Sequence, residues 1–189
     1  MGTKQRYNLS SQFIVGLERI ARSITNPTEV KDFLSLHQKN LTAILYATTY
    51  IEAKINELIA AFEIDPSTEL HSSIKVIIDV QRKISIIEKF NLLCTLLKEN
   101  SWDSSKEPFQ SFEMIIFIRN EVVHYKGKYE DGGKYPKKIK NLLHELDCAV
   151  EGNRLWLNVL LECDRLPCWI LKVVNEIDSI INKRILKHL

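Results

Sequence analysis

The chain has 189 residues, of which 45% are hydrophobic and 26% are charged. This composition is typical of a soluble globular protein and excludes a chain that is mainly disordered. Six glycines, five prolines and four cysteines are too few for a collagen-like, proline-rich or disulfide-framework protein, and no apolar run is long enough for a membrane-spanning helix. The formal net charge of +2 at pH 7 is too small to indicate a class of partner by itself.

The hydrophobic pattern predicts helices along the whole chain, because apolar residues recur every three or four positions rather than every two. The clearest example is a row of residues spaced alternately three and four positions apart, which would form one face of a helix and is called the long seam below: Leu41, Ile44, Thr48, Ile51, Ile55, Leu58 and Phe62. We expect helices over residues 10–24, 28–63, 68–82, 86–99, 108–126, 137–149, 152–162 and 166–187. The prediction is one all-α domain over residues 1–189, an up-and-down helical bundle with additional C-terminal helices.

Capping residues indicate where several of these helices begin. Asn26 and the proline after it precede the long second range, and Ser85 with Glu88 has the pattern of a capping box at the start of the fourth. The second range is long enough that we expect a break near Lys39 and Asn40.

The four cysteines, Cys94, Cys148, Cys163 and Cys168, lack the paired spacing of a zinc site. We interpret them as reduced, partly buried thiols of an intracellular protein. The N-terminal residues do not form the apolar core of a signal peptide. We therefore expect a cytoplasmic protein that needs no metal or cofactor and has no membrane segment.

The most unusual segment runs from Phe112 to Gly127. Arg119 falls at the centre of its apolar stripe, where an unpaired guanidinium is costly, so Arg119 must reach a carboxylate, a polar cleft or solvent. Asn120 and His124 are four residues apart on the neighbouring face, and Gly127 is a plausible C-terminal cap. His124 then lies in the last turn, where the helix dipole favours an imidazolium. The stripe consists of Phe112, Ile115, Ile116, Val122 and Val123.

Arg119 and His124 are five residues apart, which is about 140° around a regular helix. One helix alone therefore does not direct both side chains at the same atom. Convergence requires either an unwound helix end or a second copy that supplies the other residue. We expect a homodimer whose two-fold axis lies near the 108–126 helix.

Residues 119–124 read Arg-Asn-Glu-Val-Val-His and resemble the Arg-Asn-x-x-x-His motif of HEPN domains, named for higher eukaryotes and prokaryotes nucleotide-binding. The resemblance extends to the apolar run before the motif and to the segment 50–58, and it covers about residues 41–126. It implies a helical bundle, often dimeric, with an active site composed of the Arg and His of two protomers. Many members are metal-independent ribonucleases of toxin–antitoxin, phage-defence or RNA-processing systems, whereas others have lost catalysis and serve as binding modules.

The chemistry of RNA cleavage agrees with the roles that this resemblance implies. RNA carries its own nucleophile, the 2′-hydroxyl, so a metal-activated water is not required. His124 is suited to act as general base or acid, and Arg119 has the bidentate geometry that stabilises a pentavalent phosphorane. Asn120 would orient the imidazole or donate to a phosphate oxygen.

Three further residues are candidates for supporting this site. Glu52 and Asn56 are four residues apart beside the long seam and would hold Arg119, and Tyr125 directly follows the motif. For Tyr125 the structural alternative is packing over the helix end. Each assignment has a structural alternative. Arg119 could form an ion pair with Glu52 or another carboxylate, His124 could satisfy a helix carbonyl, and Glu52 with Asn56 could be ordinary surface residues.

Basic and aromatic residues alternate directly after the motif. Phosphate attraction combined with base stacking holds single-stranded RNA without reading its sequence. The alternative is a solvated loop whose positive charge is diluted by Glu130 and Asp131. The candidate RNA-binding residues are Lys126, Lys128, Tyr129 and Lys134.

The leading hypothesis is a metal-independent endoribonuclease of HEPN type, a toxin or phage-defence effector whose partners are RNA, a second copy of the chain and an antitoxin or other protein. The alternative is a catalytically silent helical module that binds nucleotides, RNA or another protein. The Arg-Asn-x-x-x-His pattern favours the enzyme, and the modest net charge favours the silent module.

Overall fold

A computed structural model describes residues 8–27, 34–63, 70–124, 133–148 and 152–189. Within these ranges no residue lies in a β-strand, and the predicted all-α bundle is confirmed. The helices are α1 (Ser10–Thr25), α2 (Leu36–Phe62), α3 (Leu70–Val80), α4 (Ile86–Leu96), α5 (Phe109–Val123), α6 (Lys137–Glu145), α7 (Trp156–Leu161), α8 (Leu166–Arg184) and the 3-10 helix η1 (Leu186–His188).

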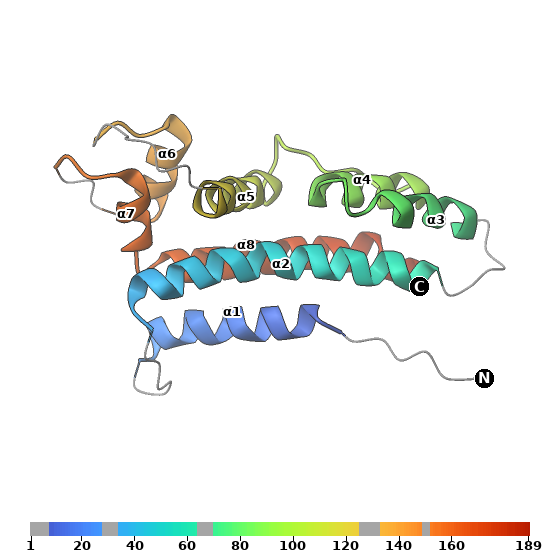
Figure 1. Ribbon diagram of the computed structural model, residues 1–189, viewed down its shortest axis with the longest axis horizontal. Coiled ribbons are helices and arrows are strands. Elements are labelled where there is room, and N and C mark those ends of the chain that lie inside the picture. The colour runs from blue at the N-terminus through green and yellow to red at the C-terminus, as the bar shows by residue number, and fades with distance from the viewer. Residues whose placement is uncertain (1–7, 28–33, 64–69, 125–132, 149–151) are drawn as a thin grey trace.

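The helices pack in layers around a central pair (Figure 1). α2 and α8 lie side by side in the middle, α1 lies on one side of them, and α3, α4 and α5 lie on the other. α6 and α7 stand at one end of the bundle. α2 contacts α1, α3, α4, α5, α7 and α8, so it is the axis on which the core is built.

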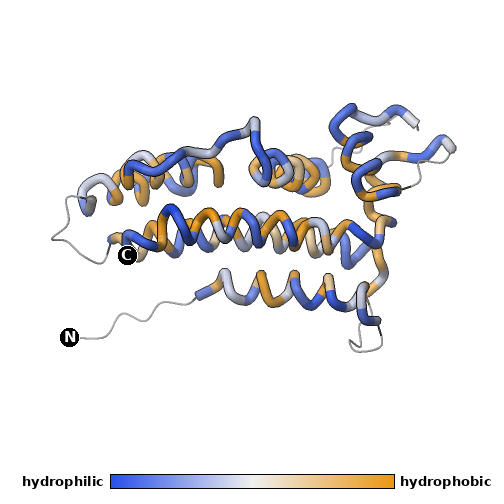
Figure 2. Tube along the Cα trace, turned by 180° about the vertical axis from the view of Figure 1, so that it is seen from behind, coloured by the Kyte–Doolittle hydropathy of each residue, from blue (hydrophilic) through white to orange (hydrophobic). Residues whose placement is uncertain are grey.

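Apolar and polar stretches alternate along the long helices, as expected for helices with one buried and one solvent-facing side (Figure 2). Ile44, Ile51 and Ile55 of α2, Phe112 of α5 and Ile170 of α8 are all fully buried. None of the helices in the described part of the chain combines the length and the apolar character that a membrane span requires.

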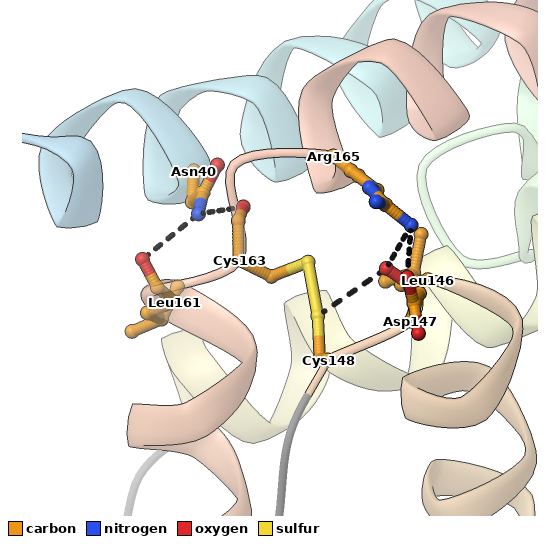
Figure 3. Close-up of a disulfide and its surroundings, with 7 residues drawn as sticks. All are labelled: Asn40, Leu146, Asp147, Cys148, Leu161, Cys163 and Arg165. Carbon is orange, nitrogen blue, oxygen red and sulfur yellow. Dashed lines mark hydrogen bonds and ion pairs between the residues drawn. A yellow bond between two sulfur atoms is a disulfide. The ribbon is translucent and has the colours of Figure 1, made fainter.

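The predicted break near Lys39 and Asn40 is wrong, because α2 continues through both residues. Asn40 is completely buried, and its Nδ2 donates hydrogen bonds of 2.8 Å each to the carbonyl oxygens of Leu161 and Cys163 (Figure 3). These carbonyls lie at the end of α7 and just beyond it. The asparagine therefore joins two segments of the fold, and this tertiary role keeps a residue of low helix propensity inside a helix.

The second helix also begins later than predicted. Ser35 is its N-cap, and Ser35 and Gln38 form a capping box, so α2 starts at Leu36. Asn26 is instead the C-cap of α1. Residues 28–33 of the predicted 28–63 helix lie outside the described residues.

Other predicted helices are shortened at ends where the backbone turns. α4 ends at Leu96 instead of 99 and α6 at Glu145 instead of 149, and each is followed by a residue in the left-handed region, Lys98 (φ 56°) and Asp147 (φ 52°). A left-handed residue stops a helix because it redirects the next N–H groups onto earlier carbonyls. α7 begins at Trp156 instead of 152.

Two helix starts are fixed by carboxylates. The predicted Ser85–Glu88 capping box is confirmed, and its hydrogen bonds lower the pKa of Glu88. At the start of α1, Glu57 of α2 accepts from the backbone N–H groups of Leu9 (2.8 Å) and Ser10 (2.9 Å). A single side chain of α2 thus accepts hydrogen bonds from two backbone N–H groups at the start of α1 that have no partner within the helix.

Gly16 allows α1 to approach α2 closely. A Cβ atom at this position would lie 2.4 Å from Cε2 of the Tyr46 ring, closer than any real Cβ contact. The ring of Tyr46 therefore packs directly on the backbone of α1, and an alanine here would require the ring to move.

Two of the four cysteines are not free thiols, so the prediction of four reduced cysteines is wrong. Cys148 and Cys163 form a disulfide that links the end of α6 to the connection between α7 and α8 (Figure 3). Their Cα atoms are 6.2 Å apart, which lies within the usual range for disulfides. Cys94 and Cys168 are free, and burial raises the pKa of Cys94 to about 11.

Candidate functional site

The candidate site is built on α5. This helix buries Phe109, Phe112, Ile115 and Ile118 against the core, and Arg119 follows them as a half-buried residue at the edge of that face. Val123 is 47% exposed, so the predicted apolar stripe does not reach the end of the helix. Arg119 is therefore less enclosed than its predicted place at the centre of a buried stripe implied.

Arg119 lines a surface cleft of about 250 Å³. Its Nη1 donates a hydrogen bond of 3.0 Å to Oδ1 of Asn120, which is exposed. Among the described residues, no carboxylate lies within ion-pair distance of the guanidinium, so most of its donors remain free for a ligand. α2, the start of α4 and α5 form the cleft, which is lined by Thr48, Thr49, Glu52, Ser85, Ile86, Ile87, Ile116, Arg119 and Asn120.

Glu52 lies on the wall of this cleft, but its ion-pair partner is Lys89 and not Arg119. Lys89 Nζ of α4 is 2.7 Å from Glu52 Oε1 of α2. The lysine side chain is only 3% exposed, whereas that of Glu52 is 44% exposed. The pair thus consists of a buried cation and a carboxylate that solvent reaches. Because Glu52 binds Lys89, the hypothesis that Glu52 compensates the charge of Arg119 is wrong.

The sequence analysis missed Lys89, which does not line the cleft but binds Glu52 on its wall, and it also missed Thr49, which does line the cleft. Lys89 follows Ile86 by three positions and precedes Leu93 by four, which places it on the apolar face of its helix. A lysine at such a position needs a buried partner, and this pattern was the signal that could have identified it.

His124 ends α5. It is the C-cap residue, and its backbone N–H donates a 2.9 Å hydrogen bond to the carbonyl oxygen of Asn120. Its side chain is exposed, and within the described ranges nothing hydrogen-bonds to its ring. The helix is regular up to Val123, so a five-residue separation still turns the Arg119 and His124 side chains about 140° apart.

The other candidate residues are not all brought to the cleft. Asn56 is half-buried one turn after Glu52, and its Oδ1 is buried without a hydrogen-bond partner in the described part of the chain. Asn56 does not line the cleft. Lys134 is exposed in the segment before α6. The remaining candidates lie outside the described residues: Tyr125, Lys126, Lys128 and Tyr129.

Comparison with protein-family models, curated proteins and solved structures gives no match. Assignment of the site therefore depends on its geometry and on its chemistry. No group of three or more potential metal ligands gathers among the described residues.

The chemistry that this arrangement can perform follows from its donors and acceptors. α5 presents a guanidinium and an amide at the cleft and an exposed imidazole at its end. α2 presents the carboxylate of Glu52 and the hydroxyl groups of Thr48 and Thr49. A phosphate group would be bound on the α5 side, where the charge is positive, and hydrogen-bond donors of a ligand would be bound on the α2 side.

Proposed function

We propose that the chain is a metal-independent endoribonuclease of HEPN type. The single observation that carries the proposal is the state of Arg119, a half-buried guanidinium at an open cleft with no carboxylate within ion-pair distance among the described residues. A structural arginine at such a position would be expected to form an ion pair. An arginine that binds phosphate would keep its donors free.

The proposed reaction is attack of the RNA 2′-hydroxyl on the adjacent phosphorus, with departure of the 5′-oxygen of the next nucleotide. The 2′-oxygen loses its proton as the P–O bond forms, and the leaving oxygen gains one as its P–O bond breaks. His124 would transfer these protons. Arg119 would stabilise the charge on the phosphorane oxygens, and Asn120 holds one side of its guanidinium.

The proposal includes a second copy of the chain. Because α5 is regular up to Val123, His124 and Arg119 of one copy leave the helix in different directions. Two copies that meet at their α5 helices would combine Arg119 of each with His124 of the other. The exposed side chains of His124 and Val123 at this end of α5 support such a contact.

Incubation with structured and unstructured RNA in EDTA tests the activity. We expect cleavage that leaves 2′,3′-cyclic phosphate or 3′-phosphate ends and 5′-hydroxyl ends, whereas DNA resists because it lacks the 2′-hydroxyl. His124→Ala and Arg119→Ala should each reduce the rate by about a hundredfold or more. His144→Ala is the matched control, because His144 is an exposed histidine on α6.

Mixing the two inactive variants tests the composite site. If each site uses residues of two chains, mixed dimers contain one intact site and recover part of the activity. Light scattering that gives only a monomer at micromolar concentration would contradict the dimer. Wild-type protein that binds RNA without ever cutting it would favour the alternative, a silent binding module, with which the net charge of +2 agrees.

A further inference from the structure

We propose that the cleft beside Arg119 is a pocket that selects guanine next to the cleaved phosphate, with the Glu52 carboxylate as the selecting group. This inference rests on the ribonuclease function proposed above, and it adds a base preference that a phosphate-binding arginine alone does not imply. The size of the cleft, about 250 Å³, lies just below the roughly 300–1,000 Å³ of pockets for drug-sized ligands. A space of this size suits one nucleobase.

The apolar lining of the cleft provides surfaces for the base. Ile86 and Ile87 at the start of α4 and Ile116 of α5 line it, and all three are half-buried. Unstacked bases of single-stranded RNA bury their faces against protein side chains, and specificity then comes from polar groups at their edges. Ser85 and Asn120 also line the cleft, and Asn120 is bound to Arg119 on the phosphate side. We assign the selection of the base to the polar groups of α2, which include the only carboxylate among the described lining residues.

The polar groups of α2 are hydrogen-bond acceptors. The hydroxyl of Thr49 donates to the carbonyl oxygen of Leu45 at 2.8 Å, and that of Thr48 donates to the same oxygen at 3.1 Å. Their protons are used by the backbone, so only their oxygen lone pairs remain for a ligand. The Glu52 carboxylate adds stronger acceptors, since only its Oε1 binds Lys89.

Lys89 keeps Glu52 in place as an acceptor. The lysine is 3% exposed and lies behind the carboxylate, so its ammonium orients Glu52 and neutralises its charge. Glu52 itself remains 44% exposed on the cleft side. A phosphate bound at Arg119 therefore meets a nearly neutral pair on α2 and not an isolated negative charge.

This arrangement distinguishes the four bases by their donors. Guanine has two neighbouring N–H donors on its pairing edge, from the ring N1 and the exocyclic N2, and a carboxylate accepts both. Adenine and cytosine offer an amino group next to an acceptor nitrogen. Uracil has one N–H, which lies between two carbonyl oxygens. These oxygens would face the acceptor groups of α2, and no hydrogen bond can form between two acceptors. The expected order of affinity is guanine first and uracil last.

Binding of the four nucleoside 3′-monophosphates tests the pocket without any cleavage. Two variants form a matched pair. The single variant Lys89→Met retains the Glu52 carboxylate, and the double variant Glu52→Gln/Lys89→Met removes it. Neither variant leaves a buried ammonium without its partner. We expect wild-type protein to bind guanosine 3′-monophosphate about tenfold or more tighter than uridine 3′-monophosphate. Lys89→Met should still prefer guanosine 3′-monophosphate, but by a smaller factor, because Glu52 loses the lysine that orients it. The double variant should bind both nucleotides about equally.

Two further readouts locate the binding and control for charge. NMR signals of the Ile86, Ile87 and Ile116 methyl groups should shift on binding if the base enters the cleft. Glu121→Gln removes an exposed carboxylate of α5 that does not line the cleft, and it should keep the guanine preference. Wild-type protein is measured in every series, so the preference is tested even where a variant unfolds.

The outcomes separate this inference from the function on which it rests. Equal binding of all four nucleotides by wild-type protein, or a preference that survives in the double variant, would overturn the guanine pocket. RNA cleavage without preference for guanine would leave the ribonuclease and remove the pocket. A guanine preference that depends on Glu52 in a protein that never cuts RNA would support the pocket and refute the enzyme.

Discussion

Replacing Glu52 by glutamine tests the ion pair that supports the cleft. Lys89 Nζ lies 2.7 Å from Glu52 Oε1, and the lysine side chain is 3% exposed. Removing one partner of a fully buried pair costs about 3–5 kcal/mol, because the remaining charge loses its compensation. Glu52 is 44% exposed, so water reaches this side of the pair, and we expect Glu52→Gln to lower the free energy of unfolding by about 2–3 kcal/mol.

Urea denaturation at pH 7 measures this loss as a lower midpoint with an unchanged slope. For a protein of this size, the melting temperature should fall by about 4–12 °C. Lys89→Met removes the buried charge and keeps a long apolar side chain, so its free energy of unfolding should stay within about 1 kcal/mol of the wild-type value. The double variant should recover most of the loss caused by Glu52→Gln.

Two results would refute this reasoning. The first is a Glu52→Gln variant that unfolds at the wild-type midpoint. The second is a Lys89→Met variant that is less stable than Glu52→Gln. Either result would mean that the stability of this region does not depend on compensating the charge of Lys89.

Three other predictions concern the rest of the bundle. Asn40→Ala leaves two carbonyl groups at the end of α7 without their donor, and urea denaturation should show a loss of about 2–4 kcal/mol. Cys148→Ser removes the disulfide to Cys163, whose two cysteines are 15 residues apart in sequence, and should lower the free energy of unfolding by about 3 kcal/mol. Dithiothreitol should cause the same loss in wild-type protein and leave the stability of the variant unchanged. Hydrogen bonds, first of all from Ser105, lower the pKa of Asp103 from 3.8 to about 2. This carboxylate therefore stabilises the folded state above pH 3.8, and in acid titrations the stability difference between wild type and Asp103→Asn should shrink as the pH falls toward about 2.

The existence and type of the helices followed from local pattern, but their ends did not. The three-and-four spacing of apolar residues is a property of each segment, so it predicts a helix before any tertiary contact is known. A break near Lys39 and Asn40 was expected because the predicted helix over residues 28–63 is unusually long. The place of Asn40 inside α2 is explained only by hydrogen bonds to residues more than a hundred positions away.

The same limit applies to the candidate site. The order of residues predicted correctly that His124 stands near the end of the helix that carries Arg119, but α5 ends at Val123 and not at 126, and His124 is its C-cap in place of the predicted Gly127. Which cation Glu52 binds depends on how α4 lies on α2, and the sequence analysis considered only Arg119 as its partner. The pairing of Cys148 with Cys163 likewise depends on the fold, because a spacing of 15 residues has no local meaning.

The central position of α8 has a consequence for synthesis on the ribosome. α8 packs against α1, α2 and α5, and its fully buried residues include Leu166, Val174 and Ile181. Translation proceeds at roughly 5–20 residues per second, so on the order of ten seconds separate the synthesis of α2 from that of α8. During this interval the apolar sides of the earlier helices lack their partner. We therefore expect a nascent chain stalled before α8 to be cut rapidly by a protease that spares the chain once residues 166–184 have packed.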